Sequence, residues 1–94
     1  MNNSVNLRFS NTITKLAGYP YGLSIYQTQV KGIIDIMQPC TIVFPNHIER
    51  VASSFVQGFF AEIINEIGYQ RIENNITLVT SSQELTDDIW NKLI

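Results

Sequence analysis

The stretch ERVASSFVQGFFAEII, residues 49–64, decides the fold of this chain. An apolar run begins directly after two adjacent serines, and polar residues occupy the positions between its large side chains. The apolar positions recur at the spacing of one wide helical stripe: Phe55, Phe59, Phe60, Ile63, Ile64 and Ile67. This pattern predicts an amphipathic helix over residues 54–67, and Gly68 is a typical residue to end it.

Short apolar runs on both sides of this helix predict strands. CTIVF (40–44) and ITLVT (76–80) are continuous runs bounded by polar or turn-forming residues. VNLRF (5–9) alternates apolar and polar residues, and TITKLA (12–17) repeats the alternation, so the two segments predict a hairpin. ITLVT would be entered through a polar turn at residues 73–75.

Two further helices are expected outside this central region. GYPYG (18–22) predicts a loop. Helical spacing from Ser24 predicts a helix that ends before Pro39. A final helix would turn Leu85, Ile89, Trp90 and Leu93 inward. The alternation of strands and helices predicts one α/β domain over residues 1–94, with a mixed sheet of about four strands and about three helices.

The composition excludes several classes of protein. The chain has 94 residues, a net charge of −2 and only six scattered Lys and Arg residues, so we expect no nucleic-acid surface. No apolar stretch approaches the ~20 residues that span a bilayer, so we expect no membrane segment. The single cysteine, Cys40, is compatible with a reducing cytoplasm. Charged residues make up 15 %, and such a surface is compatible with a homodimer.

Catalytic chemistry has little support in the sequence. His47 is the only histidine, so a Ser/His hydrolase would have to combine it with Ser53 or Ser54. The segment VASSF lacks both glycines of the G-x-S-x-G nucleophile turn. We therefore expect no enzyme, metal or cofactor. A small-ligand or nucleotide site at the strand ends, at residues 45–54 and 80–82, is a further alternative.

The three tyrosines around Pro20 allow two interpretations. Tyr19, Tyr21 and Tyr26 could line an aromatic interface patch, or they could pack against the edge of the sheet. The second interpretation is the simpler one, because it needs no partner.

The serine pair also has a structural and a functional interpretation. With Ser54 as the N-cap, Gln57 completes an S-x-x-Q capping box, which explains Ser54 without any function. Ser53 has no such explanation. A hydroxyl at the start of a helix is a favourable place for a phosphate, because the free backbone N–H groups attract an anion.

Five short motifs have a recognisable order along the chain: YPYG (19–22), Pro39, TIVF (41–44), SSFVQGFF (53–60) and ITLVT (76–80). Together they resemble the STAS-like domains of the DUF4325 type, distant relatives of bacterial anti-sigma-factor antagonists. The resemblance covers residues 20–94, although Ala52 stands where the antagonists carry Asp and Phe55 where they carry Gly. It implies a STAS-like fold and docking to a histidine-kinase-like ATPase, which in the antagonists phosphorylates a serine of this turn.

We therefore expect a non-catalytic protein–protein interaction module. Its docking surface would combine the loop at residues 45–54 with the exposed face of the helix over 54–67. Ser53 or Ser54 would carry the contact or the phosphate. Glu49 and Arg50 would supply polar rim contacts, and Gly58 would permit close approach of the partner.

Overall fold

Two small parallel sheets form the framework of the computed structural model, which describes residues 3–93. The larger sheet has the order β1-β3-β5 and the smaller one pairs β2 with β4. The predicted α/β class is confirmed, but a single mixed sheet is wrong, because every pair is parallel. The strands are β1 (Ser4–Asn6), β2 (Lys15–Leu16), β3 (Cys40–Val43), β4 (Arg50–Val51) and β5 (Ile76–Val79).

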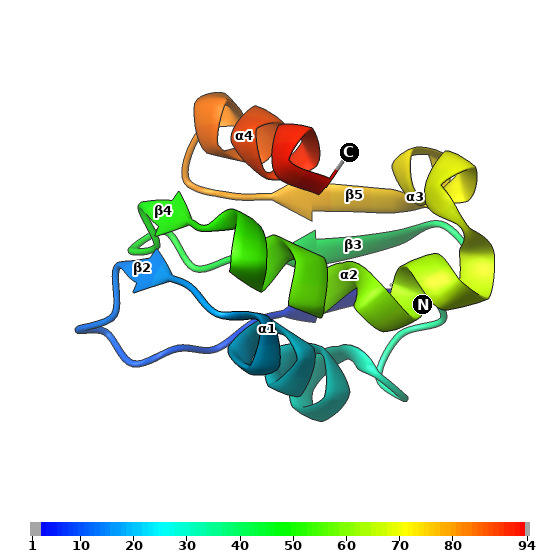
Figure 1. Ribbon diagram of the computed structural model, residues 1–94, viewed down its shortest axis with the longest axis horizontal. Coiled ribbons are helices and arrows are strands. Elements are labelled where there is room, and N and C mark those ends of the chain that lie inside the picture. The colour runs from blue at the N-terminus through cyan, green and yellow to red at the C-terminus, as the bar shows by residue number, and fades with distance from the viewer. Residues whose placement is uncertain (1–2, 94) are drawn as a thin grey trace.

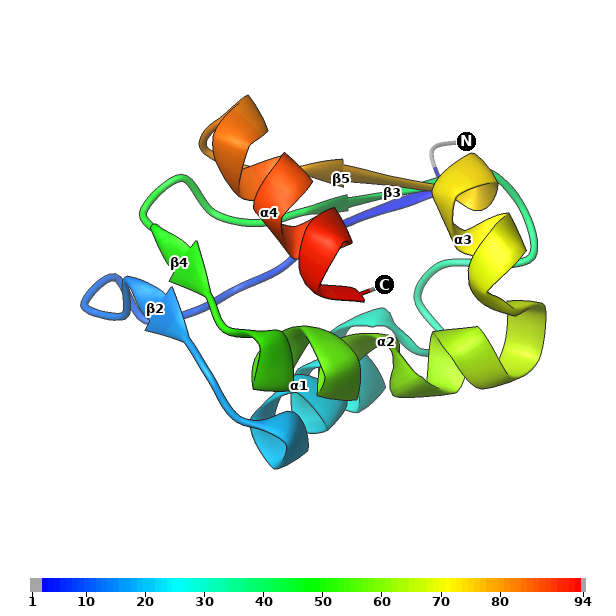
Figure 2. The ribbon, with the colours of Figure 1, turned by 45° about the horizontal axis from the view of Figure 1, so that its top comes forward.

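The helices lie together on one side of the three-stranded sheet, with α1 and α2 in front of the strands and α4 beside β5 (Figure 1, Figure 2). Within residues 3–93, no helix combines the length and the apolar character needed to cross a membrane. The helical segments are α1 (Tyr19–Ile25), the π-helix η1 (Tyr26–Val30), α2 (Ser53–Ile67), α3 (Tyr69–Asn75) and α4 (Gln83–Leu93).

The core lies between this helical layer and the sheet. On β3 and β5, buried residues alternate with more exposed ones, as expected when one face of a sheet packs against helices. Phe55, Phe59 and Phe60 of α2 are fully buried, as the helical stripe predicted. The ring centroids of Phe55 and Phe59 lie 5.9 Å apart and those of Phe59 and Phe60 5.1 Å apart. These rings make α2 the central element of the fold.

The N-terminal third differs from the predicted arrangement. The predicted hairpin is wrong, because β1 pairs with β3 and β2 pairs with β4. GYPYG is not a loop but the start of α1, with Pro20 in the first turn, where its missing N–H group costs no hydrogen bond. The helix expected up to Pro39 ends at Val30.

The exposed side chains after Val30 explain why the helical pattern misled. Ile33 is 61 % exposed and Met37 45 %, so these residues do not belong to a buried stripe. Gly32 adopts φ 80°, a left-handed conformation that breaks the helical path and favours glycine. Apolar spacing alone does not show this interruption.

Gly68 joins two helices at the other end of α2. Its φ of 78° and its N–H bond to the carbonyl of Ile64 confirm it as the end of α2. The chain then enters α3 at once, so the polar turn expected at residues 73–75 is wrong. At its N-terminal end, α2 follows β4 with only Ala52 between them, which places the serine pair at the end of the smaller sheet.

Candidate functional site

The serine pair forms the first turn of α2 and does not precede it. Ala52 is the N-cap, with an extended backbone and no side-chain hydrogen bond, so Ser53 and Ser54 are the first two helical residues. The predicted capping box of Ser54 and Gln57 is therefore wrong. Both serines are exposed, and the helix begins one residue earlier than the sequence predicted.

The two serines nevertheless differ in their surroundings. The hydroxyl of Ser54 accepts a hydrogen bond of 2.9 Å from the backbone N–H of Gly18, at the start of α1. This bond links the N-terminal ends of α1 and α2 across 36 residues of chain. Among residues 3–93, no hydrogen bond reaches the Ser53 hydroxyl. Ser53 therefore offers its hydroxyl to solvent, whereas Ser54 has a structural role.

Gly58 lies under α1 and not on a surface that a partner could reach. A Cβ added at Gly58 would lie 2.0 Å from the carbonyl oxygen of Tyr19, and one added at Gly22 would lie 2.2 Å from that of Phe55. The two helices thus touch backbone to backbone, which only glycine allows at these positions. The prediction that Gly58 permits close approach of a partner is therefore wrong, because Gly58 is buried and the element that approaches it is α1.

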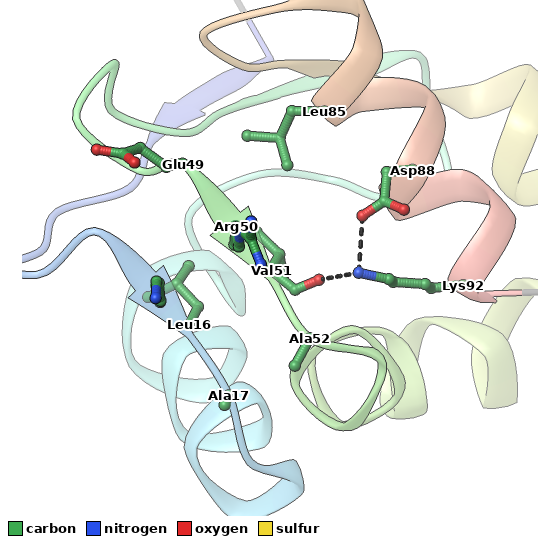
Figure 3. A pocket seen from close by; sticks show the side chains of 10 residues that line it. Leu16, Ala17, Glu49, Arg50, Val51, Ala52, Leu85, Asp88 and Lys92 are labelled. Carbon is green, nitrogen blue, oxygen red and sulfur yellow. Dashed lines mark hydrogen bonds and ion pairs between the residues drawn. The ribbon is translucent and has the colours of Figure 1, made fainter.

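Glu49 and Arg50 border a hollow of about 500 Å³ next to the serine pair (Figure 3). On its α4 side, the Lys92 ammonium donates 2.8 Å to the carbonyl of Val51 and pairs with Asp88 at 2.7 Å. The carboxylate of Glu49 points away from this pair. The hydrogen bond from Lys92 to Val51 fixes α4 against the end of β4, and so against the start of α2.

Two cations lie side by side at the rim of this hollow. Lys15 of β2 and Arg50 of β4 are in register in the two-stranded sheet, and both are exposed. Like charges at opposite positions of a strand pair repel each other. The exposed carboxylate of Glu49 lines the same hollow and Lys92 is paired with Asp88, so the charged side chains of the hollow leave one net positive charge.

A strip of exposed aromatic and apolar groups runs along the accessible side of α2. We call it the α2 strip, and its residues are Tyr19, Gln57, Ala61, Ile64, Tyr69 and Leu93. Tyr19 at the start of α1 is 46 % exposed, and Tyr69 at the start of α3 is 59 % exposed. Between them, a shallow hollow of about 300 Å³ is lined by Gln57, Ala61, Ile64 and Leu93.

The strip continues beyond the C-terminal end of α2. A second hollow of about 400 Å³ shares Tyr69 and Leu93 and extends to Ile72. Tyr69 was not predicted from the sequence, because the segment after Gly68 carries no clear helical pattern. An aromatic residue directly after the helix-ending Gly68 is the signal that could have marked it. Of the earlier tyrosines, Tyr21 packs edge-on against Phe55 and Tyr26 is buried.

On the opposite flank of α2, an ion pair and a hydrogen bond connect Glu62 to Lys31 and Gln27. The Glu62 carboxylate accepts hydrogen bonds of 2.8 Å from Lys31 and from Gln27. The hydrogen bond from Lys31 is the main cause that lowers the pKa of Glu62, and it raises the pKa of Lys31. Burial, with Glu66 and Glu62 nearby, raises the pKa of Tyr26 to about 12. The contacts of Glu62 with Gln27 of η1 and with Lys31 cover this flank of α2. The α2 strip is the exposed side of the helix.

His47 has a contact that accounts for its position. Its Nε2 atom lies 3.0 Å from the carbonyl oxygen of Ser10, so the ring connects the loops that precede β2 and β4. Within residues 3–93, neither serine of the pair is hydrogen-bonded to His47, and no group of three or more His, Cys, Asp or Glu residues could hold a metal ion.

No family model, no curated protein and no solved structure matches this chain.

Proposed function

We propose that this chain is a non-catalytic interaction module of STAS-like type, which docks a partner protein through the α2 strip and the adjoining serine pair. The observation that carries the proposal is the exposure of Tyr19 and Tyr69 on either side of Ala61 and Ile64. Tyrosine is enriched among the residues that dominate binding energy, because its ring is apolar and its hydroxyl finds polar partners.

The partner that the family resemblance implies is a histidine-kinase-like ATPase or a regulator. Such a partner would meet this chain in the cytoplasm, where the lone thiol of Cys40 would stay reduced. Of the two serines, Ser53 is the candidate for phosphorylation or direct contact, since the Ser54 hydroxyl already binds Gly18. A phosphate on Ser53 would lie at the positive end of α2 and near Arg50.

Alanine substitutions in the α2 strip test the proposal. Chemical crosslinking and affinity purification from the source cell would identify proteins that bind the wild type. Tyr19→Ala and Tyr69→Ala should remove the same partner, while Met37→Ala should keep it. Met37 is a matched control, because it is a large apolar residue with 45 % exposure outside the strip.

The thermal melting of all three variants should stay close to that of the wild type, because each side chain is about half exposed and none belongs to the buried core. A partner retained by both tyrosine variants would refute the α2 strip as the docking surface. A partner lost equally from Met37→Ala would show that the loss is not specific to the strip.

A small-ligand site is the second candidate function, and the hollow beside β4 supports it. Lys15 and Arg50 would attract an anionic group such as a phosphate or carboxylate. Native mass spectrometry of the purified chain with added nucleotides would test this alternative. Binding that weakens in Arg50→Ala and persists in Tyr69→Ala would favour the ligand site over the protein-docking surface.

A further inference from the structure

Strand β5 forms one edge of the three-stranded sheet, with β3 on its inner side (Figure 1). The N–H of Phe44 donates 2.8 Å to the carbonyl of Val79, so the backbone groups of Val79 point toward β3. Successive residues of a strand direct these groups to opposite edges. The outer side therefore carries the carbonyl of Ile76, the N–H and carbonyl of Leu78, and the N–H of Thr80. We call these groups the β5 edge.

The β5 edge has no hydrogen-bond partner in the described part of the chain, residues 3–93. Proteins commonly protect such an edge with a lysine, a proline or a bulge. The strand reads ITLV, contains neither residue, and keeps a regular register with β3 from Ile76 to Val79. Its residues favour strand pairing, because three of the four are β-branched. The β5 edge is therefore open to a further strand.

The other edge of the sheet is blocked just after β1. The N–H of Arg8 donates 2.7 Å to the Oε1 atom of Gln29, whose Nε2 atom donates 2.9 Å to the carbonyl of Arg8. The side-chain amide of Gln29 thus satisfies both outward groups of Arg8, as a neighbouring strand would. A strand added to β1 would have to stop at Asn6, whereas the β5 edge has no such block among residues 3–93.

A hollow of about 480 Å³ lies between β5 and α4 and gives access to the β5 edge. Gln83, Thr86 and Trp90 line it from one side of α4, because residues three and four apart share a helix face. The Trp90 ring is half-buried, with its centroid 5.9 Å from that of Phe60. The hollow therefore offers an aromatic surface next to the free backbone groups of β5.

The charge of this hollow favours a cation. Among the described residues that line it, Glu73 of α3 alone is ionisable. Its side chain is exposed, and within residues 3–93 it takes part in neither of the ion pairs, which join Lys31 to Glu62 and Lys92 to Asp88. Arg71 lies two positions before Glu73 on α3 and does not line the hollow. A lysine or arginine side chain entering here would meet a carboxylate and no competing cation of the lining.

We propose that the β5 edge binds an extended segment of a partner protein, which adds a fourth strand to the sheet. An apolar or aromatic side chain of that segment would lie against Trp90, and a lysine or arginine side chain would lie near Glu73. In strand addition, main-chain hydrogen bonds supply affinity and side-chain pockets supply specificity. The β5 edge provides the first, and the hollow beside α4 provides the second.

This surface is distinct from the α2 strip, but the two lie near each other. Glu73 also lines the hollow at Tyr69, which extends the strip beyond α2. A variant at Glu73 alone would therefore not separate the two surfaces. Tyr69→Ala separates them, because Tyr69 does not line the hollow beside β5.

A displayed library of random peptides of about ten residues, the upper end of ordinary strand length, supplies the probe. Peptides selected on the immobilised chain should alternate apolar with polar residues and carry a lysine or arginine. Fluorescence anisotropy of a labelled synthetic peptide should give a Kd of about 10–100 μM. Glu73→Lys should weaken binding about tenfold through like-charge repulsion. Glu84→Lys is the matched control, because Glu84 is an exposed carboxylate of α4 outside the hollow.

Hydrogen exchange of single amides, followed by NMR in the wild type, tests the strand geometry without any variant. In the free protein, the N–H groups of Leu78 and Thr80 should exchange faster than that of Phe44, which bonds to Val79. The bound peptide should slow the exchange of both. Peptides methylated on alternate backbone nitrogens are the chemical control. One set should lose binding, because its blocked nitrogens face β5, and the other set should keep it.

Three results would overturn the proposal. The library could yield no binding peptide, or a bound peptide could leave the Leu78 and Thr80 amides unprotected. A peptide lost in Tyr69→Ala and kept in Glu73→Lys would bind the α2 strip instead. Protection of the same two amides that grows with the concentration of the protein alone would make a second copy of the chain the occupant.

Discussion

The middle of α2 and its first turn belong to one helix but differ in how they are held. In the middle, Gly58 touches the backbone of α1, and Phe59 is fully buried among aromatic rings. In the first turn, Ser53 and Ser54 are exposed, and a single hydrogen bond to Gly18 fixes one of them. The buried face in the middle of α2 thus maintains the fold, whereas the first turn leaves the Ser53 hydroxyl free for contact.

Phe59→Ala should produce the largest loss of stability. Its ring is fully buried and packs against Phe55, Phe60, Tyr26 and Phe44. We expect the free energy of unfolding to fall by about 3–5 kcal/mol. Urea denaturation followed by circular dichroism would measure it, with the exposed Gln57→Ala as control. A loss no greater than that of the control would remove the distinction between the two parts of α2.

Gly58→Ala tests the contact between the helices through the sign of its effect. In an open helix interior, replacing glycine by alanine stabilises by about 1 kcal/mol. At Gly58 the added methyl group would meet the backbone of Tyr19, so we expect a loss of about 1–3 kcal/mol or more. The same denaturation experiment measures it. A stabilised Gly58→Ala protein would mean that α1 does not press against α2.

The serine pair should show a smaller difference. Ser54→Ala removes the acceptor for the Gly18 N–H group and should cost about 1 kcal/mol, the net value of one hydrogen bond. Ser53→Ala should leave the unfolding free energy almost unchanged, because no contact is lost. Measured side by side under one denaturant series, equal values for the two variants would contradict the separate roles assigned to them.

The pH dependence of the Lys31–Glu62 pair should be the smallest effect, since both groups are partly exposed. The pKa of Glu62 is lowered in the folded state, so its stabilising contribution is present above its ordinary pKa of 4.5 and is lost as the pH falls through the folded value. Denaturation of the wild type and of Glu62→Gln from pH 7 to pH 3 should show a slightly steeper loss in the wild type. Parallel curves would leave this pair without a role in stability.

The elements with the strongest local pattern were predictable from the sequence. The stripe from Phe55 to Ile67 and the final helix around Ile89 have clear helical spacing, and both are confirmed. The strands at 40–43 and 76–79 were confirmed as well. In each of these segments the spacing of apolar residues is enough to predict the secondary structure, without knowledge of distant partners.

Features that depend on distant partners were not predictable. TITKLA alternates like a hairpin strand, but Lys15 and Leu16 pair with residues 50–51. The apolar spacing that includes Ile33 and Met37 is interrupted by the left-handed Gly32. At the site, the serine pair was correctly predicted at the start of the helix, but the capping role predicted for Ser54 is wrong, because its hydroxyl binds a backbone group 36 residues away.

The parallel pairing of every strand has a consequence for the folding rate. Ser4 aligns with Thr41, Lys15 with Arg50, and Cys40 with Ile76, so each pair joins positions more than thirty residues apart. Closing such loops costs chain entropy before the contacts form, and high contact order slows folding. This chain should therefore fold more slowly than a helical bundle of the same length. Its newly made strands stay exposed until α2 and the segments beyond it have been synthesised.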